Sequence, residues 1–99
     1  MSRSDFRDFA SRDVVFEWDN DKRRANIAKH GIDFADAAEV FCDPKQYTLR
    51  SRIRSGETRF VSVGTAGGSL IAVVFTWRGN TVRIVSARAA RRSERDQYG

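Results

Sequence analysis

The spacing of apolar residues changes at Pro44, and this change constrains the fold more than any other feature of the sequence. Before Pro44, apolar residues recur at the spacing of a helix, at i, i+3, i+4 and i+7: Phe34, Ala37, Ala38 and Phe41. After Pro44, the segments 58–66, 69–78 and 81–89 have the composition and turn signals of strands. Helices that precede a run of strands predict an α+β domain, with two N-terminal helices packed on one face of an antiparallel sheet.

The first half predicts one strand and two helices. Residues 14–18 are branched and aromatic, as in a strand, and Asp19 is a favoured N-cap for a helix that ends at Gly31. Asp33 is expected to cap the second helix, and Pro44 to end it. Three residues of the first helical segment are expected to face the core: Ala25, Ala28 and Ile32.

The second half predicts an antiparallel meander. The pairs Gly67-Gly68 and Gly79-Asn80 are two-residue turns between strands. The segment 69–78 is apolar on both faces and is expected to be the central strand. A weaker, polar strand precedes the meander at 46–52, and the basic segment 90–98 is expected to form a short C-terminal helix or tail.

Size and composition limit the architecture and the location. With 99 residues, the chain is expected to form a single domain over residues 14–99, preceded by a flexible N-terminal arm at residues 1–13. No apolar run approaches the roughly 20 residues that a membrane-spanning helix needs. The single cysteine, Cys42, is consistent with a reducing compartment, so the cytoplasm is the expected location.

Charge is distributed unevenly along the chain. Lys and Arg outnumber Asp and Glu by 18 to 13. Every basic residue after position 45 is an arginine, and only three carboxylates accompany them: Glu57, Glu94 and Asp96. Arginine binds phosphate oxygens in pairs, so this half predicts a polyanionic partner, with nucleic acid as the first candidate. A solvated basic surface that only maintains solubility is the alternative.

Three blocks of sequence resemble the BrnT family of toxins from bacterial type II toxin-antitoxin modules. They are FEWDNDKRRANIAKHGIDFADAAEVFCD, GETRF with a glycine four residues on, and VRIVSARAARRSERDQY, and together they span about residues 15–98. The resemblance implies a RelE-like fold, endoribonuclease activity and a ribbon-helix-helix antitoxin as partner. The sequence has no recognisable helix-turn-helix, so promoter DNA is expected to be contacted only through the antitoxin complex.

Cleavage of RNA by its own 2′-hydroxyl requires a proton acceptor, a charge stabiliser and a proton donor, but no metal. Arginines can stabilise the charge. Carboxylates spaced for two metals are absent from the basic half, so no metal and no other cofactor is expected.

His30 is the only histidine and the obvious acid-base candidate. It lies at the expected C-terminus of a helix, where an imidazole commonly binds the last carbonyls, so a structural role and a catalytic role both remain open.

The remaining candidates are arginines and one acidic residue of the strands. Glu57 and Arg59 are two apart and project from the same face of a strand, either as a base beside a phosphate clamp or as a surface ion pair. Arg78 and Arg83 flank a turn and are expected to face each other, which favours an anion between them. Arg88 has the parity of Val82 and Ile84, so we expect it to reach into a pocket.

These residues make up the candidate site. The catalytic candidates are His30, Glu57, Arg59, Arg83 and Arg88. The candidates for RNA binding are Arg78, Arg91, Arg92, Arg95 and Tyr98.

The sequence thus predicts a ribonuclease that acts through an arginine-lined face of its sheet. An antitoxin is expected to cover that face around Arg59, Arg78 and Arg83, and to rest on exposed aromatics such as Trp77. A non-catalytic module that binds nucleic acid or protein is the alternative.

Overall fold

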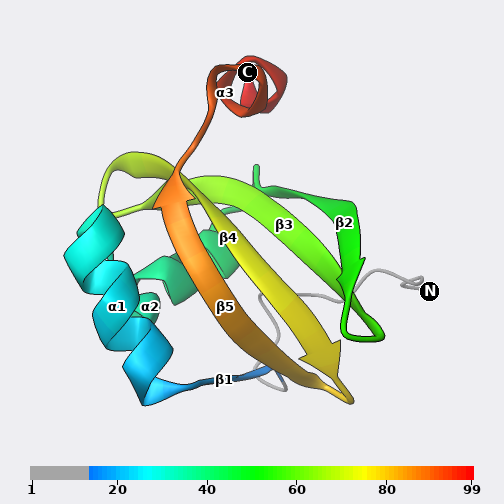
Figure 1. Ribbon diagram of the computed structural model, residues 1–99. Helices are drawn as coiled ribbons and strands as arrows, with labels where there is room; N and C mark the ends of the chain where they lie inside the picture. Colours follow the sequence, from blue (N-terminus) through cyan, green and yellow to red (C-terminus); the bar gives the residue numbers. More distant parts are fainter. Residues whose placement is uncertain (1–13) are drawn as a thin grey trace.

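The computed structural model describes residues 14–99, which form a five-stranded sheet with helical segments beside it and a C-terminal helix at one end (Figure 1). The expected arm at residues 1–13 lies outside the described residues. The elements in chain order are β1 (Val15–Trp18), α1 (Asn20–His30), α2 (Phe34–Ala37), the 3₁₀ helix η1 (Ala38–Cys42), β2 (Tyr47–Arg54), β3 (Glu57–Ala66), β4 (Ser69–Arg78), β5 (Thr81–Ala89) and α3 (Arg92–Tyr98).

The strand order is β1-β5-β4-β3-β2, so the prediction that 69–78 is the central strand is confirmed. The expected sheet was antiparallel throughout, and this is wrong at one edge. β1 pairs in parallel with β5, from Val15 opposite Thr81 to Trp18 opposite Ile84. The α+β class is confirmed, but the sheet is mixed. The last strand of the meander, β5, lies between β4 and the first strand of the chain, β1, and runs parallel to β1.

The predicted turns connect the meander. Gly67 and Gly68 have φ values of 59° and 82°, and Gly79 has a φ of 62°, all in the left-handed region where glycine is favoured. A further two-residue turn, which the sequence patterns did not predict, joins β2 to β3 at Ser55 and Gly56.

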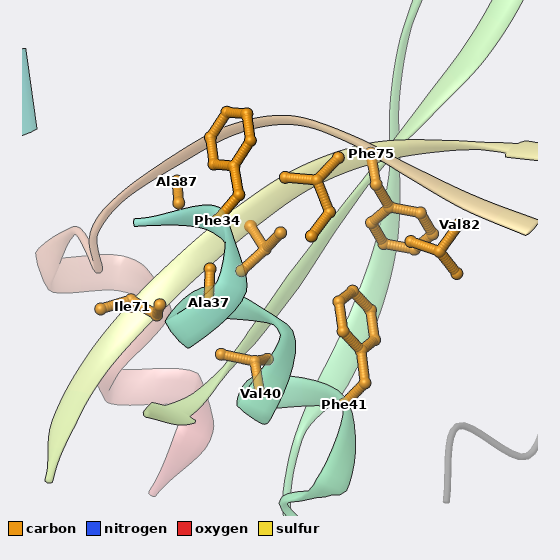
Figure 2. Close-up of a cluster of buried hydrophobic side chains, with 10 residues drawn as sticks. Phe34, Ala37, Val40, Phe41, Ile71, Phe75, Val82 and Ala87 are labelled. Atoms are coloured by element: carbon orange, nitrogen blue, oxygen red, sulfur yellow. The ribbon is translucent and has the colours of Figure 1, made fainter. Parts of the chain in front are cut away.

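The core lies between α2, η1 and one face of the sheet (Figure 2). Phe34, Ala37 and Phe41 are buried as predicted, and Phe41 meets Phe75 of β4 edge to face at 5.1 Å between ring centroids. The segment is not the full second helix that was expected. Only four residues are α-helical before the chain tightens into η1, because the helix must end ahead of Pro44.

α1 meets the sheet through a polar residue, so the expected apolar contact by Ala25 and Ala28 is wrong. Both alanines are exposed, Ile32 is partly buried, and Asn26 is the one buried residue of α1. The Asn26 side chain donates to the carbonyl oxygens of Ala87 (3.0 Å) and Ile32 (2.9 Å), and accepts from the N–H of Ala87 (3.1 Å).

The reason is the shortness of β1. Its pairing with β5 ends at Ile84, which leaves the edge of β5 without a strand neighbour near Ala87. A buried backbone N–H and C=O need partners, and the amide of Asn26 supplies both. The ends of α1 follow the sequence prediction: Asp19 accepts from the N–H groups of Asp21 and Lys22, and Gly31 caps the C-terminus with a φ of 73°.

Among residues 14–99, no helix is long and apolar enough to cross a membrane.

Candidate nucleic-acid interface

One face of the sheet is turned away from α2 and η1, and we call it the open face. Successive side chains of a strand point to opposite faces. In β4, Ile71, Val73 and Phe75 belong to the core, so the alternate residues Ala72, Val74, Thr76 and Arg78 lie on the open face. In Figure 1 this face is toward the viewer, with α2 behind the strands and α3 at one end.

The end of the open face near the β4–β5 turn is charged. Arg78 forms an ion pair with Glu57 at 3.2 Å, and Arg83 forms one with Glu17 at 2.8 Å. Arg78 and Arg83 do not face each other as expected, because Arg78 pairs with Thr81 across the hairpin and Arg83 pairs with Thr76. Each arginine therefore has its own carboxylate, and the two side chains do not require a bound anion between them.

Arg59 lies in the same region. Its neighbour Phe60 pairs with Phe75 and packs against the core, which directs Arg59 to the open face together with Glu57. The Nε atom of Arg59 is buried and has no hydrogen-bond partner among the described residues. A buried N–H without an acceptor is rare and costly, so Arg59 stands out as a donor that an anion can satisfy.

Arg88 has a different environment from the one expected. The register between β4 and β5 shifts between Val74 and Phe75, and the shift places an extra residue, Val85, in β5. Beyond it the parity reverses: Ala87 is in the core, and Arg88 is on the face opposite Val82 and Ile84. The expected parity of Arg88 is therefore wrong.

Arg88 binds both carboxylate oxygens of Glu94 in α3, at 2.8 and 2.9 Å. The two side chains are only 18% and 14% exposed. The hydrogen bonds from Arg88 lower the pKa of Glu94, and those to Glu94 raise the pKa of Arg88. This geometry gives Arg88 an anchoring role, in which it fastens α3 to the sheet.

α3 has a second anchor at its C-terminal end. The Tyr98 hydroxyl donates to Asp43 at 2.5 Å, and the Lys45 ammonium lies 4.8 Å from the centre of the Tyr98 ring. Desolvation opposes ionisation of Asp43, but hydrogen bonds from Tyr98 and from Lys45 and Thr65 outweigh it and lower the pKa of Asp43 to about 2. Tyr98 is thus engaged in packing rather than presented to a base.

The three other predicted contacts of the C-terminal segment are exposed: Arg91, Arg92 and Arg95. Their exposure is compatible with binding to an RNA backbone and with simple solvation.

His30 lies apart from the arginines of the open face. It lines a cleft of about 760 Å³ with Gly67, Asp36 and Arg95, at the end of the sheet where β3 turns into β4. Arg59 precedes Gly67 by eight residues of extended chain, a distance of about 26 Å. The structure brings Glu57, Arg59, Arg78 and Arg83 to one region, but it does not bring His30 to them.

Sequence reasoning missed Glu17 and Thr76, which belong to the open face, and Asn26, which joins α1 to the edge of β5. Glu17 is the ion-pair partner of Arg83. Thr76 belongs to β4, and its hydroxyl donates to the carbonyl oxygen of Thr58 in β3 at 2.9 Å. Asn26 lies between Ala25 and Ile27 in the sequence, and this pattern did not indicate that Asn26 is the buried residue of the helix. The parallel pairing that positions Glu17 had no signal in the sequence.

Trp77 is not exposed on this face. Its side chain packs against the core, on the opposite side of β4 from Arg78. The expectation that an antitoxin rests on Trp77 beside the arginines is therefore wrong.

Within residues 14–99, no three His, Cys, Asp or Glu side chains are grouped closely enough to hold a metal ion. Residues 18–94 match the family described as the ribonuclease toxin, BrnT, of type II toxin-antitoxin system. No curated protein matches the chain.

Proposed function

Because this chain belongs to the BrnT family of ribonuclease toxins of type II toxin-antitoxin systems, we propose that it cleaves RNA on the open face of its sheet without a metal ion. The observation that carries the proposal is the buried Nε of Arg59, which has no hydrogen-bond partner within residues 14–99. A phosphate placed against Arg59 satisfies this donor and lies in the region that also contains Glu57 and Arg83. An RNA substrate is consistent with a cytoplasmic location.

The proposed reaction uses groups of this region in separate roles. The 2′-hydroxyl of a nucleotide attacks the adjacent phosphorus, and Glu57 accepts its proton. Arg59 and Arg83 stabilise the negative charge that develops on the phosphoryl oxygens. The bond to the 5′-oxygen breaks, and this oxygen takes a proton from water. The products are a 2′,3′-cyclic phosphate and a 5′-hydroxyl end.

The ion pairs of the open face are suited to this sequence of steps. Arg78 holds Glu57 at 3.2 Å and Glu17 holds Arg83 at 2.8 Å, which restricts the rotamers of a base and of a charge stabiliser before substrate binds. The two pairs are 30–51% exposed at their side chains, so an incoming phosphate can compete for both arginines.

The decisive experiment is incubation of the purified chain with end-labelled RNA in EDTA. We expect cleavage to 2′,3′-cyclic phosphate or 3′-phosphate ends, at the same rate in EDTA as in buffer that contains magnesium. Products with 5′-phosphate ends that appear only with magnesium would disprove the mechanism. A shift of RNA in a gel without shortening would instead favour a non-catalytic binding module.

A matched pair of variants tests the assignment of Arg59. Arg59→Ala is expected to lower the cleavage rate by about 100-fold or more, because it removes a donor aimed at charge that develops in the transition state. Arg92→Ala removes an exposed arginine of α3, and we expect only a mild weakening of RNA binding, which is largest at low salt and shrinks as salt rises. Equal, small losses in both variants contradict a catalytic role for Arg59.

We propose further that the fold is RelE-like and that a ribbon-helix-helix antitoxin covers the open face around Arg59, Arg78 and Arg83. Seven more positive than negative charges after position 45 favour an acidic segment there. Antitoxin and RNA then exclude each other. An antitoxin complex that binds RNA with unchanged affinity would place the antitoxin elsewhere.

A further inference from the structure

A shallow groove runs between α1 and β5, apart from the region of the open face that contains Glu57, Arg59, Arg78 and Arg83. It has a volume of about 200 Å³. The helix contributes most of its lining and the strand contributes the rest: Lys22, Ala25, Asn26, Lys29, His30, Val85 and Ser86. In Figure 1, α1 flanks the sheet on the side of β5, beyond the end of β1.

The charged side chains that line this groove are all basic. Lys22 and Lys29 are exposed and belong to no ion pair found in residues 14–99. The two other cations of α1 are already paired, Arg23 with Asp33 at 2.9 Å and Arg24 with Asp21 at 2.5 Å. The helix therefore presents its uncompensated positive charge toward the groove.

The spacing of the two lysines suits a linear polyanion. Seven residues separate them, which is about two turns or 10 Å along the helix. This distance is close to one Debye length at physiological salt, so each ammonium interacts mainly with its own anion. A row of backbone phosphates supplies such anions at intervals.

The groove is continuous with the open face. Ser86 lines the groove and also pairs with Val74, a residue of the open face. Along β5, Ser86 lies between Arg83 and Arg88. A nucleic acid strand with one phosphate at Arg59 and Arg83 can therefore continue across β5 at Ser86 and along α1.

We propose that this groove holds the stretch of single-stranded RNA that flanks the scissile phosphate, with Lys22 and Lys29 bound to its phosphates and His30 donating a hydrogen bond at the end of the groove. The inference rests on the proposed ribonuclease function. Single-stranded RNA fits better than an acidic polypeptide. Of the described residues, only Ala25 and Val85 are apolar in the lining, and they offer no pocket for an anchoring side chain.

Binding is measured without cleavage, by fluorescence anisotropy with a labelled RNA dodecamer whose riboses are 2′-O-methylated. Lys22→Gln and Lys29→Gln are each expected to weaken binding by about 3- to 10-fold at low salt and to reduce the log–log salt slope by about 0.7, the value for one lost phosphate contact on a single strand. Arg24→Gln, on the same helix but outside the groove lining, is the matched control and is expected to bind like the wild type.

A second measurement does not depend on variants. Titration of the wild type with the same RNA is expected to shift the backbone NMR signals of Ala25 and Ser86. If either lysine variant has lost its native circular dichroism, this titration decides the question.

The outcomes separate the two proposals. Equal affinity for Lys29→Gln and Arg24→Gln, with unshifted signals at Ser86, overturns the groove assignment whether or not RNA is cleaved. Lysine-dependent binding by a protein that cleaves no RNA refutes the ribonuclease mechanism but retains the groove. Absence of RNA binding by the wild type overturns both. A polyglutamate peptide that binds as tightly, with the same lysine dependence, identifies the groove as a site for acidic protein instead.

Discussion

Replacement of Asn26 by alanine is expected to destabilise the fold strongly, although asparagine contributes little apolar surface to a core. Asn26 is 6% exposed, and its side chain makes three hydrogen bonds to backbone groups, at 2.9, 3.0 and 3.1 Å. Asn26→Ala leaves the N–H and C=O of Ala87 and the C=O of Ile32 without these partners. Each buried group that loses its partner costs about 1–3 kcal/mol.

The expected size of the effect follows from these terms. Three lost bonds give a cost of about 3–5 kcal/mol, once partial hydration of the groups is allowed for. The higher helix propensity of alanine returns about 0.5 kcal/mol. A domain of this size typically has 5–15 kcal/mol of stability, so the variant is expected to lose a large fraction of it.

Urea unfolding followed by circular dichroism measures the free energy of unfolding. With an m-value of about 1.5 kcal/mol/M, the midpoint is expected to fall by about 2–3 M. Lys29→Ala is the control, because Lys29 is exposed on the same helix and its propensity resembles that of alanine. Asn26→Asp tests the donors separately, since a carboxylate still accepts from Ala87 but donates to neither carbonyl.

Amide hydrogen exchange gives a local readout of the same contact. The N–H of Ala87 is expected to exchange faster in Asn26→Ala than in Lys29→Ala. A difference of less than about 1 kcal/mol between the two variants, with unchanged protection at Ala87, would refute the idea that Asn26 closes the edge of β5.

Three further predictions concern α3 and its surroundings. Glu94→Gln removes the bidentate partner of Arg88 and is expected to lower the free energy of unfolding by about 1–3 kcal/mol and to speed tryptic cleavage in α3; unchanged cleavage contradicts the anchoring role. The pKa of Asp43 is lowered from 3.8 to about 2, so the stability it contributes is present above pH 3.8 and lost as pH falls through about 2. Acid titration of stability is therefore expected to be shallower in Asp43→Asn than in Asp36→Asn, and identical curves disprove this contribution. Gly64→Ala places a Cβ atom 3.0 Å from a side-chain carbon of Gln46 and 3.0 Å from one of Val40, so we expect a lower melting temperature than that of the wild type. An unchanged melting temperature would contradict this crowding.

Local patterns in the sequence predicted most of the elements. The caps at Asp19, Gly31 and Asp33 act through their own backbone neighbours, so they need no tertiary information. The turns at Gly67-Gly68 and at Gly79 depend on the conformational freedom of glycine, and the central position of β4 depends on its apolar residues on both faces. The arginine-rich second half and the placement of Glu57 with Arg59 follow from composition and from the alternation of a strand.

Tertiary structure decided which of these residues share an environment. The extra residue at Val85 reverses the parity of β5, and this moves Arg88 from the expected pocket to an ion pair with Glu94. A bulge results from how two distant strands are paired, so periodicity within one strand cannot reveal it. For the same reason, the parallel pairing that brings Glu17 to Arg83 was not predictable.

The role of α1 shows the limit of sequence patterns most directly. The three- and four-residue spacing of Ala25, Ala28 and Ile32 predicted a helix with these residues toward the core, and the helix is present at the predicted residues. Its buried side chain is Asn26, because β1 ends at Trp18 and leaves the backbone of Ala87 without a strand partner on the side away from β4. The sequence determined that a helix forms between Asp19 and Gly31. The unpaired edge of a strand more than fifty residues away decided which side of that helix is buried, because buried backbone groups must find hydrogen-bond partners wherever the fold provides them.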